Sequence, residues 1–373
     1  MAIVIQPYRE KHQAAVADFN RRLQAAGAAP DLVFYGSAEP QWLSPAKSSS
    51  LYNEFFVALD NGVVRGCYAL KHQDLWFAGG KTLSVAYYHH PLSEGIVNKS
   101  YAVVGSLLLR DAMQRASLLY CLGMGGYDRP LPRMLVGLGW SHYLLPFYFR
   151  VVHPNRFLRE MNGLRTSPLR RLAMDIGAFT GAGWLALKAH QGFSGIKSPR
   201  AANVTVEEIP EFREWADSLW EQNKKSFAMT AVRDYANLRL LYSAPQTHLT
   251  KLRIRRDGKD IGWAVAGERR KDPKFGALRV GSIVDCWASP EDCLPVVRAA
   301  AHNLEEKRVD LIVSNQSHQS WCAAFESAGF MTTESTFIFA ASKPLAALLQ
   351  PFDETKYRIH FTRADGDGLP QNF

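Results

Sequence analysis

Apolar and polar positions recur with two different periods along the chain, and the order of these periods predicts its elements. Residues 3–8 form a short apolar strand, and residues 9–27 then place apolar side chains at helical spacing up to a glycine. Residues 50–90 follow the alternation typical of β-strands, interrupted by glycine-containing turns. Residues 100–152 predict a helix, a short buried strand, a second helix and a last strand.

The same order of elements begins again near residue 202. Residues 202–223 predict a strand and a helix, and residues 248–288 predict a series of alternating strands. Residues 289–340 predict a helix, a buried strand, a helix and a strand. We interpret the repetition as an internal duplication, so that the chain contains two domains of one fold.

Glycines mark matching positions in the two halves. Gly62 corresponds to Gly258, each within a turn, and Gly66 corresponds to Gly262, each close to an aromatic residue. The last helix of each half also ends with glycine and an aromatic residue, in "GLGW" and "SAGF". These matches support the duplication.

Each half orders its elements as strand, helix, three-stranded meander, helix, strand, helix and strand. This order predicts a mixed α/β (α+β) domain with a largely antiparallel front and a parallel crossover. Basic and small residues interrupt the pattern between the halves, so we expect a partly helical connector there. The predicted ranges are an N-terminal domain at 1–153, the connector at 154–200, a C-terminal domain at 201–345 and a tail at 346–373.

Length and composition narrow the class of protein. The chain has 373 residues, which suits about two domains of ordinary size. No apolar run approaches the ~18 residues of a membrane span, and charge comes too early at the N-terminus for a signal peptide. The 5 cysteines are an odd number without a C-x-x-C pair, so no zinc or disulfide framework follows. We therefore expect a cytoplasmic protein.

The net charge of +9 favours anionic partners, among them nucleotides, phosphorylated cofactors, nucleic acid and anionic lipid. General solubility is the alternative explanation. The connector has basic residues beside an apolar face, so it either packs against its own domains or makes a peripheral contact with a membrane.

The element order and the "GLGW" and "SAGF" endings together resemble the GNAT superfamily of acyl-CoA N-acyltransferases. The last helix of that family commonly closes in Gly-Phe before the final strands. The resemblance covers nearly the whole chain as tandem GNAT-like domains, and it extends to FemAB-type aminoacyltransferases and to GNAT-like proteins of polysaccharide gene clusters. It implies two centrally splayed mixed sheets flanked by helices, with acetyl-CoA or another acyl-CoA as a substrate and no metal.

An acyl-CoA carries a pyrophosphate, which binds the free N–H groups at a helix N-terminus. Before such a helix the family typically has Arg or Gln, two residues, Gly, one residue and Gly. Ser100, Val103 and Gly105 stand at these positions here, and only Gly105 matches. The alternative is a plain loop-to-helix transition. The candidates for cofactor binding are Lys99, Ser100, Val103, Val104, Gly105 and Ser106.

The second domain has Glu291 and Asp292 at the corresponding helix start, and these side chains would repel a pyrophosphate. If one domain binds CoA, the sequence therefore favours the first.

N-acylation needs a neutral amine, so a general base assists it. In the first domain His89 and His90 end the fourth strand, and alternation predicts that they point to opposite faces of the sheet. A hydrogen-bonded structural role is the alternative for either histidine. The resemblance adds Tyr127 as a proton donor to the departing thiolate, and we expect substrate contacts at Tyr88 and Asp128.

In the second domain Asp285 lies within an apolar strand, where a carboxylate needs a partner or a raised pKa. It is the candidate catalytic residue of that domain. His318 follows the next buried strand and is a candidate substrate contact, with helix capping as the alternative.

The tail has its own pattern. Alternating apolar residues at 357, 359 and 361 predict an additional strand, and "ADGDG" then brings Asp365 and Asp367 between glycines. The spacing is similar to that of a calcium loop, but the rest of that motif is missing. A mobile polar tail is the alternative.

Three functions follow from these observations. The first is an acyl-CoA-dependent N-acyltransferase acting on a small-molecule or glycan amine, such as an amino sugar of a surface polysaccharide. The second is a non-catalytic binding protein built from GNAT-like domains. The third is a FemAB-like aminoacyl-tRNA-dependent transferase, which the basic charge favours, although no long coiled-coil arm is present. We do not expect DNA as a partner.

Overall fold

The computed structural model describes residues 3–45, 49–162, 203–243, 248–268 and 275–366. Most of the predicted connector and Asp367 of the tail therefore lie outside the described residues. The chain forms two compact units, and each unit combines two stretches of sequence. Unit 1 comprises residues 1–144 and 338–352, and unit 2 comprises residues 145–337 and 353–373.

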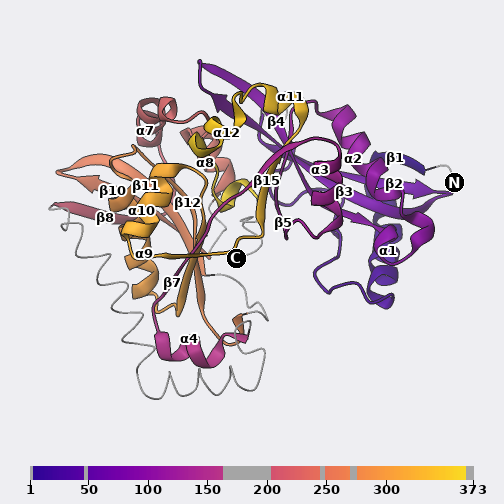
Figure 1. The fold of residues 1–373 in the computed structure, drawn as a ribbon, viewed down its shortest axis with the longest axis horizontal. Helices are drawn as coiled ribbons and strands as arrows, with labels where there is room; N and C mark the ends of the chain where they lie inside the picture. The colour runs from indigo at the N-terminus through magenta and orange to yellow at the C-terminus, as the bar shows by residue number, and fades with distance from the viewer. Residues whose placement is uncertain (1–2, 46–48, 163–202, 244–247, 269–274, 367–373) are drawn as a thin grey trace. The chain divides into compact units, whose positions relative to one another are not determined.

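Unit 1 is built on one mixed sheet (Figure 1). Its first strands form an antiparallel meander, the fourth and fifth are parallel, and the last pair is antiparallel. In spatial order the strands are β1 (Ile3–Pro7), β2 (Tyr52–Asp60), β3 (Val63–Phe77), β4 (Lys81–Ser93), β5 (Leu119–Met124), β15 (Phe337–Ala341) and β6 (Ser141–Leu144).

Helices cover both faces of this sheet. On one face α1 (Gln13–Ala25) buries Val16 and Phe19 in a core that includes Ala69 of β3. On the other face α2 (Val104–Arg115) buries Leu108 against Tyr68 and Tyr88. The helix α3 (Pro130–Gly137) contributes Leu135 to this second core. We call the two sides of the sheet the α1 face and the α2 face.

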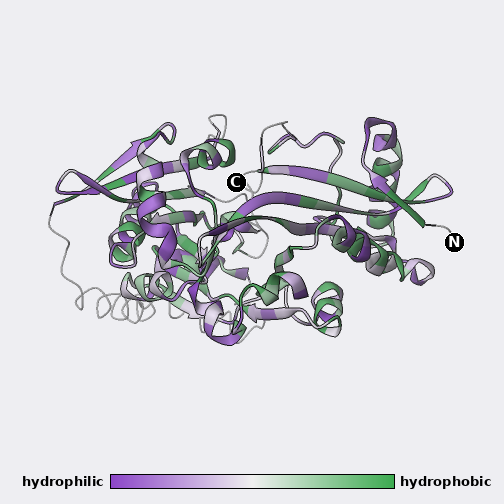
Figure 2. Cartoon of the chain, turned by 90° about the horizontal axis from the view of Figure 1, so that it is seen from above, coloured by the Kyte–Doolittle hydropathy of each residue, from purple (hydrophilic) through white to green (hydrophobic). Residues whose placement is uncertain are grey.

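Unit 2 repeats this architecture. In spatial order its strands are β8 (Val204–Ile209), β10 (Leu249–Arg256), β11 (Lys259–Glu268), β12 (Val280–Ala288), β13 (Leu311–Asn315), β7 (Phe147–Val151) and β14 (Met331–Thr333). Its helices include α4 (Pro154–Glu160), α7 (Trp215–Asn223), α8 (Tyr235–Leu241), α9 (Cys293–Glu306) and α10 (Gln319–Ser327). The strands of both units carry apolar stretches, and the helices combine apolar with polar residues (Figure 2).

The duplication is visible in the register of the strands. The β2–β3 and β10–β11 pairs each contain a bulge, after Ala58 in the first and after Ile254 in the second. Gly66 and Gly262 stand at equivalent places beside these bulges. The predicted mixed α/β fold with two related domains is confirmed.

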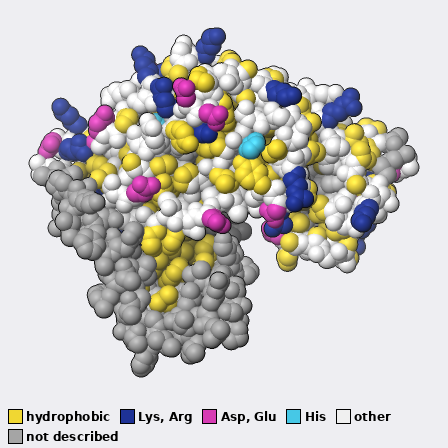
Figure 3. Space-filling view, in the orientation of Figure 1, with side chains coloured by type: hydrophobic (Ala, Val, Ile, Leu, Met, Phe, Trp, Pro, Cys, Tyr) yellow, Lys and Arg dark blue, Asp and Glu magenta, His cyan; other side chains and the backbone are white. Residues whose placement is uncertain are grey.

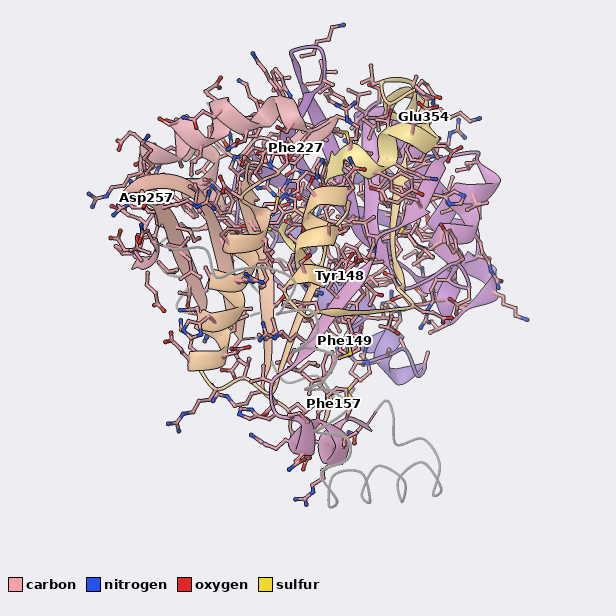
Figure 4. All side chains as sticks on the ribbon, turned by 60° about the vertical axis from the view of Figure 1, so that its left-hand side comes forward. Tyr148, Phe149, Phe157, Phe227, Asp257 and Glu354 are labelled. Atoms are coloured by element: carbon pink, nitrogen blue, oxygen red, sulfur yellow. The ribbon has the colours of Figure 1, made fainter. Side chains whose placement is uncertain are left out.

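Each sheet takes one strand from the other half of the chain. The strand β7 follows β6 in sequence, yet it pairs with β13 and β14 in the sheet of unit 2. The strand β15 follows β14 in sequence, yet it lies between β5 and β6 in the sheet of unit 1. Figure 4 shows Tyr148 and Phe149 on β7. Periodicity predicts that these strands exist, but it carries no information about which sheet each one joins.

Among the described residues, no helix combines the length and the hydropathy needed to cross a membrane. Lys and Arg side chains stand apart from one another on the face in view in Figure 3, interspersed with Asp and Glu. On this face the positive charge is distributed and does not form one basic patch.

Candidate active site

The central strands of unit 1 separate part-way along their length. The strands β4 and β5 pair only at Ala86 with Leu119 and at Tyr87 with Tyr120. Both strands continue beyond these pairs, and β4 keeps its pairing with β3 as far as Ser93. We call the place where they separate the first wedge, bounded by residues 88–93 and 121–124.

Unit 2 has the same feature. The strands β12 and β13 pair from Val280 to Ser282 and from Leu311 to Val313, although β12 continues to Ala288. We call this place the second wedge, bounded by residues 283–288 and 314–317. Central strands that separate were implied by the resemblance, and both sheets have them.

His89 lies on β4 at the first wedge. It is only 6% exposed, and its ring stacks on that of Tyr87 at 5.0 Å between centroids. Its Nε2 atom has no hydrogen-bond partner among the described residues. Burial, with His90 and Lys71 adding to it, lowers the pKa of His89 well below its ordinary value. His89 is therefore a neutral imidazole, the form in which histidine accepts a proton.

His90 has a different environment. Its Nε2–H donates to the carbonyl oxygen of Val33 at 2.7 Å, and its ring lies against Phe34 and Tyr35. Burial lowers the pKa of His90, and the hydrogen bond to Val33 opposes this shift. Both Val33 and Phe34 belong to the segment after α1, so His90 connects that segment to β4.

The prediction that His89 and His90 point to opposite faces is wrong. His89 is paired with Ala69, which lies in the core beneath α1, and His90 contacts Phe34 of the same core. A β-bulge between β3 and β4 is the reason: the register shifts between Cys67 and Ala69, and His90 has a positive φ of 52°. An inserted residue breaks the alternation on which the prediction rested.

Polar and aromatic residues that sequence reasoning missed hold His89 in place. The ring of Tyr87 stacks on Tyr120 at 5.0 Å, and the Tyr87 hydroxyl donates to the carbonyl of Leu122 at 2.8 Å, across the first wedge. Gln73 Nε2 donates to the Tyr120 hydroxyl at 2.5 Å. The sequence does contain a signal for these residues, because polar side chains occur at alternate positions of neighbouring strands.

Tyr88 points away from His89. It is buried in the core on the α2 face, where its ring lies 5.4 Å from that of Tyr68. Its hydroxyl has no hydrogen-bond partner among the described residues, and burial raises its pKa well above the ordinary value. Tyr88 as a substrate contact stays a prediction.

The start of α2 lies beside the end of β4. Val103 is its N-cap residue, half-exposed and without a capping side-chain hydrogen bond, so the first N–H groups of the helix have no side-chain cap. A Cβ atom on Gly105 would meet only the Cβ of Ser93, at 4.0 Å. Ser106 donates its hydroxyl to the carbonyl of Val103 at 2.7 Å.

The remaining cofactor candidates divide into two kinds. Lys99 and Ser100 are exposed in a 3-10 turn just before α2, and the Ser100 N–H is held by Asn98 at 3.0 Å. Val104 is fully buried in the core on the α2 face, which makes its side chain a packing residue.

Tyr127 and Asp128 are exposed in the turn between β5 and α3. The Tyr127 hydroxyl is 2.8 Å from Nδ1 of His142 on β6. Burial raises the pKa of Tyr127, so the phenol keeps its proton. It is therefore in the form that the predicted proton donor requires.

Asp285 stands in unit 2 at the position equivalent to His89, because Val265 pairs with Asp285 as Ala69 pairs with His89. The carboxylate is fully buried. Its Oδ2 atom accepts from Arg233 at 2.8 Å and from the Tyr242 hydroxyl at 2.7 Å.

The other carboxylate oxygen of Asp285 accepts from Thr362 and from the N–H of Cys286, each at 3.0 Å. Burial raises the pKa of Asp285, and the Arg233 guanidinium opposes that shift. The expected partner of this carboxylate is thus present. Its predicted catalytic role stays a prediction.

His318 is buried at the start of α10. Its Nδ1 atom accepts from the N–H of Ser320 at 3.3 Å, which makes it the N-cap residue. Burial, with Arg358 adding to it, lowers the pKa of His318 to about 4. The alternative of helix capping is thus what the structure contains, and a substrate contact stays a prediction.

The start of α9 differs from that of α2. Asp292 is the N-cap residue, and its carboxylate is held by Arg256 at 2.7 Å and by the Ser289 hydroxyl at 3.1 Å. An acidic group already occupies this helix N-terminus. Among the described residues, no group of three His, Cys, Asp or Glu side chains could hold a metal ion.

No protein-family model matches the sequence, and no curated protein matches it. Solved structures do match. The N-myristoyltransferase of Saccharomyces cerevisiae, solved with bound myristoyl-CoA, has a TM-score of 0.54 and 9% identity, over 92% of this chain and 79% of that one. A GCN5-related N-acetyltransferase from Anabaena variabilis has a TM-score of 0.51 and 9% identity, over 91% and 72%. The chain has a GNAT-type N-acyltransferase fold.

Proposed function

We propose that the protein is an acyl-CoA-dependent N-acyltransferase whose donor site is the first wedge together with the start of α2. The carrying observation is that unit 1 joins two features at the same end of β4. One is the neutral, unpartnered Nε2 of His89, and the other is the uncapped start of α2. The equivalent places in unit 2 hold the carboxylates of Asp285 and Asp292, and each of these is ion-paired with an arginine.

The reaction needs one proton acceptor and one proton donor. The amine nitrogen of the acceptor attacks the thioester carbon, the carbon–sulfur bond breaks, and CoA leaves as a thiolate. Nε2 of His89 takes the proton from the amine, because the imidazole is neutral and its nitrogen is free. Tyr127 supplies the proton that the thiolate accepts.

We propose acetyl-CoA or a longer acyl-CoA as the donor and a small-molecule or glycan amine as the acceptor. The phosphates of the donor bind the first N–H groups of α2, with Lys99 and Ser100 beside them. His90 supports the site by tying the segment after α1 to β4. Of the predicted acceptor contacts, Asp128 remains part of this proposal, whereas Tyr88 and His318 stay predictions from the sequence.

Calorimetric titration with CoA and with acetyl-CoA tests the donor site. Gly105→Glu adds a negative charge at the start of α2, and Gly105→Gln adds the same bulk without charge. We expect Gly105→Glu to weaken CoA binding about tenfold or more, and Gly105→Gln to weaken it by less than about threefold. Both variants should fold, since a Cβ at this position meets only Ser93 at 4.0 Å.

Two results would contradict the proposal. One is the absence of heat and of thermal stabilisation with either ligand in the unmodified protein. The other is equal CoA affinity of the Glu and Gln variants, which would remove the start of α2 from the site.

A further inference from the structure

The C-terminal segment, Ile359–Asp365, is buried throughout: none of its residues is more than 5% exposed. Ile359 and His360 form the short strand β16, which pairs in parallel with β9 (Met229–Ala231). The predicted additional strand is therefore present, but it is short and joins β9 of unit 2. The alternative of a mobile polar tail is wrong for these residues.

This segment bonds to both strands of the second wedge. The Thr362 hydroxyl donates to Asp285 of β12 at 3.0 Å, and Arg363 Nη1 donates to Asn315 of β13 at 2.8 Å. Asp285 and Asn315 both lie beyond the last paired residues, Ser282 and Val313. The segment thus lies where the two strands have separated.

The segment is also fastened just beyond β13. The Ser317 hydroxyl donates to the carbonyl of Ile359 and accepts from the N–H of Phe361, each at 2.7 Å. Ile359 and Phe361 are fully buried apolar residues. Ile359 and Phe361 are therefore held in place both by hydrogen bonds to their main chain and by the burial of their side chains.

A buried charge network completes the attachment. Arg233 bridges Asp285 of β12 at 2.8 Å and Asp365 of the segment at 2.7 Å. All three side chains are almost fully buried. Withdrawing the segment would leave Nη2 of Arg233 without its acceptor in a buried site, which is unfavourable.

The first wedge is different at the equivalent position. His89 stands where unit 2 has Asp285, and its Nε2 has no partner among the described residues. The first wedge therefore has a buried ring nitrogen without a partner among the described residues, whereas the second wedge has its carboxylate saturated by Arg233, Tyr242 and Thr362.

We infer that the C-terminal segment is a permanent internal occupant of the second wedge, and that each chain consequently binds one acyl-CoA, in the first wedge. The occupant is this chain's own sequence, held by Thr362 and Arg363. The number of acyl-CoA molecules rests on the proposed function, whereas the occupancy of the second wedge does not.

Amide hydrogen exchange of the ligand-free full chain tests the occupancy. The segment should exchange as slowly as β13 in the unmodified protein. Thr362→Val removes the hydroxyl that bonds Asp285, so exchange within residues 359–365 should accelerate about tenfold or more. Thr362→Ser keeps the hydroxyl and is the matched control, with exchange close to that of the unmodified protein. Rapid exchange of the segment in the unmodified protein would overturn the inference.

Calorimetry with CoA tests the stoichiometry. We expect one CoA per chain for the unmodified protein, and after Gly105→Glu only that one site, weakened about tenfold or more. Two CoA per chain, or a site that keeps its full affinity after Gly105→Glu, would overturn the inference while leaving the enzyme class intact. No CoA binding at all would instead contradict the proposed function, and the exchange experiment would still decide whether the second wedge is filled.

Discussion

At the scale of single residues, the burial of His318 makes the stability of the protein depend on pH. It is 3% exposed, and its pKa is lowered from 6.5 to about 4. As the pH falls below 6.5, the unfolded chain binds a proton at this residue that the folded protein does not bind until about pH 4. Its contribution to stability is therefore complete above pH 6.5 and is lost as the pH falls from 6.5 to 4.

We expect His318→Asn to abolish this loss, because asparagine cannot be protonated and is itself a good N-cap residue. Relative to its value at pH 7.5, the free energy of unfolding at pH 5 should fall about 2 kcal/mol less in the variant than in the unmodified protein. Urea unfolding at the two pH values measures this difference. His302→Asn makes the same change at a histidine whose side chain is 71% exposed, and an equal effect in both variants would contradict the prediction.

The residues of the candidate site were predictable as a group but not in their roles. Paired histidines at a strand end and an acid within an apolar strand stand out in the sequence. The bulge at His90 is set by tertiary packing, and it decides which histidine is free. The partners of Asp285 come from positions 233, 242 and 362, far apart in the chain, so no local pattern could indicate them.

At the scale of elements, one glycine in each unit allows a helix to approach a strand closely. A Cβ on Gly66 would meet Cγ1 of Val104 at 2.8 Å and the carbonyl oxygen of Leu92 at 3.0 Å. A Cβ on Gly262 would meet the carbonyl oxygen of Trp287 at 2.5 Å, and backbone cannot move aside as a side chain can. The second site therefore tolerates less.

We expect Gly262→Ala to lower the free energy of unfolding by about 3 kcal/mol and Gly66→Ala by about 1 to 2 kcal/mol. Gly137→Ala is the control: it lies at the end of α3, its Cβ would meet nothing within 4 Å, and alanine in a helix is neutral or stabilising by about 0.5 kcal/mol. Urea unfolding of the three variants measures these changes. Equal losses at all three positions would show that close approach is not the cause.

The order of the elements was predictable from periodicity, since strands and helices impose different spacings on apolar residues. The glycine correspondence also gave the duplication, because Gly66 and Gly262 are required by the same contact in each unit. The destination of β7 and β15 was not predictable in this way. Both are short five-residue strands that begin with apolar side chains, and their periodicity does not indicate which sheet each one joins.

At the scale of the whole molecule, the exchange of β7 and β15 is encoded by what each strand would bury. The registers of the two sheets place Phe149 where unit 1 has Ala341, and Arg150 where it has Ser342. Ala341 and Ser342 are both essentially fully buried. In unit 2, Arg150 instead pairs with Glu305 at 2.8 Å and donates to the carbonyl of Ala328 at 3.3 Å.

A strand that stayed in its own half would therefore overpack the core with Phe149 and bury the charge of Arg150 without its partner. The contiguous range 1–153 contains β7 but lacks β15, so we expect it to be unstable and to aggregate through the unpaired edges of β5 and β6. Residues 1–144 joined to 338–352 contain every strand of unit 1. Because Leu144 and Ile338 are paired in an antiparallel register, a two-residue Asn-Gly turn can join them.

We expect the joined protein to be monomeric and to unfold cooperatively, and residues 1–153 to be aggregated or to lack a cooperative transition. Size-exclusion chromatography and urea unfolding of the two proteins measure the difference. Arg150→Ser together with Phe149→Ala in residues 1–153 provides the matched test of the cause, because these changes restore the small side chains that Ala341 and Ser342 have at the two positions. A stable, cooperative 1–153 without these changes would mean that β7 can serve either sheet and that the exchange has another origin.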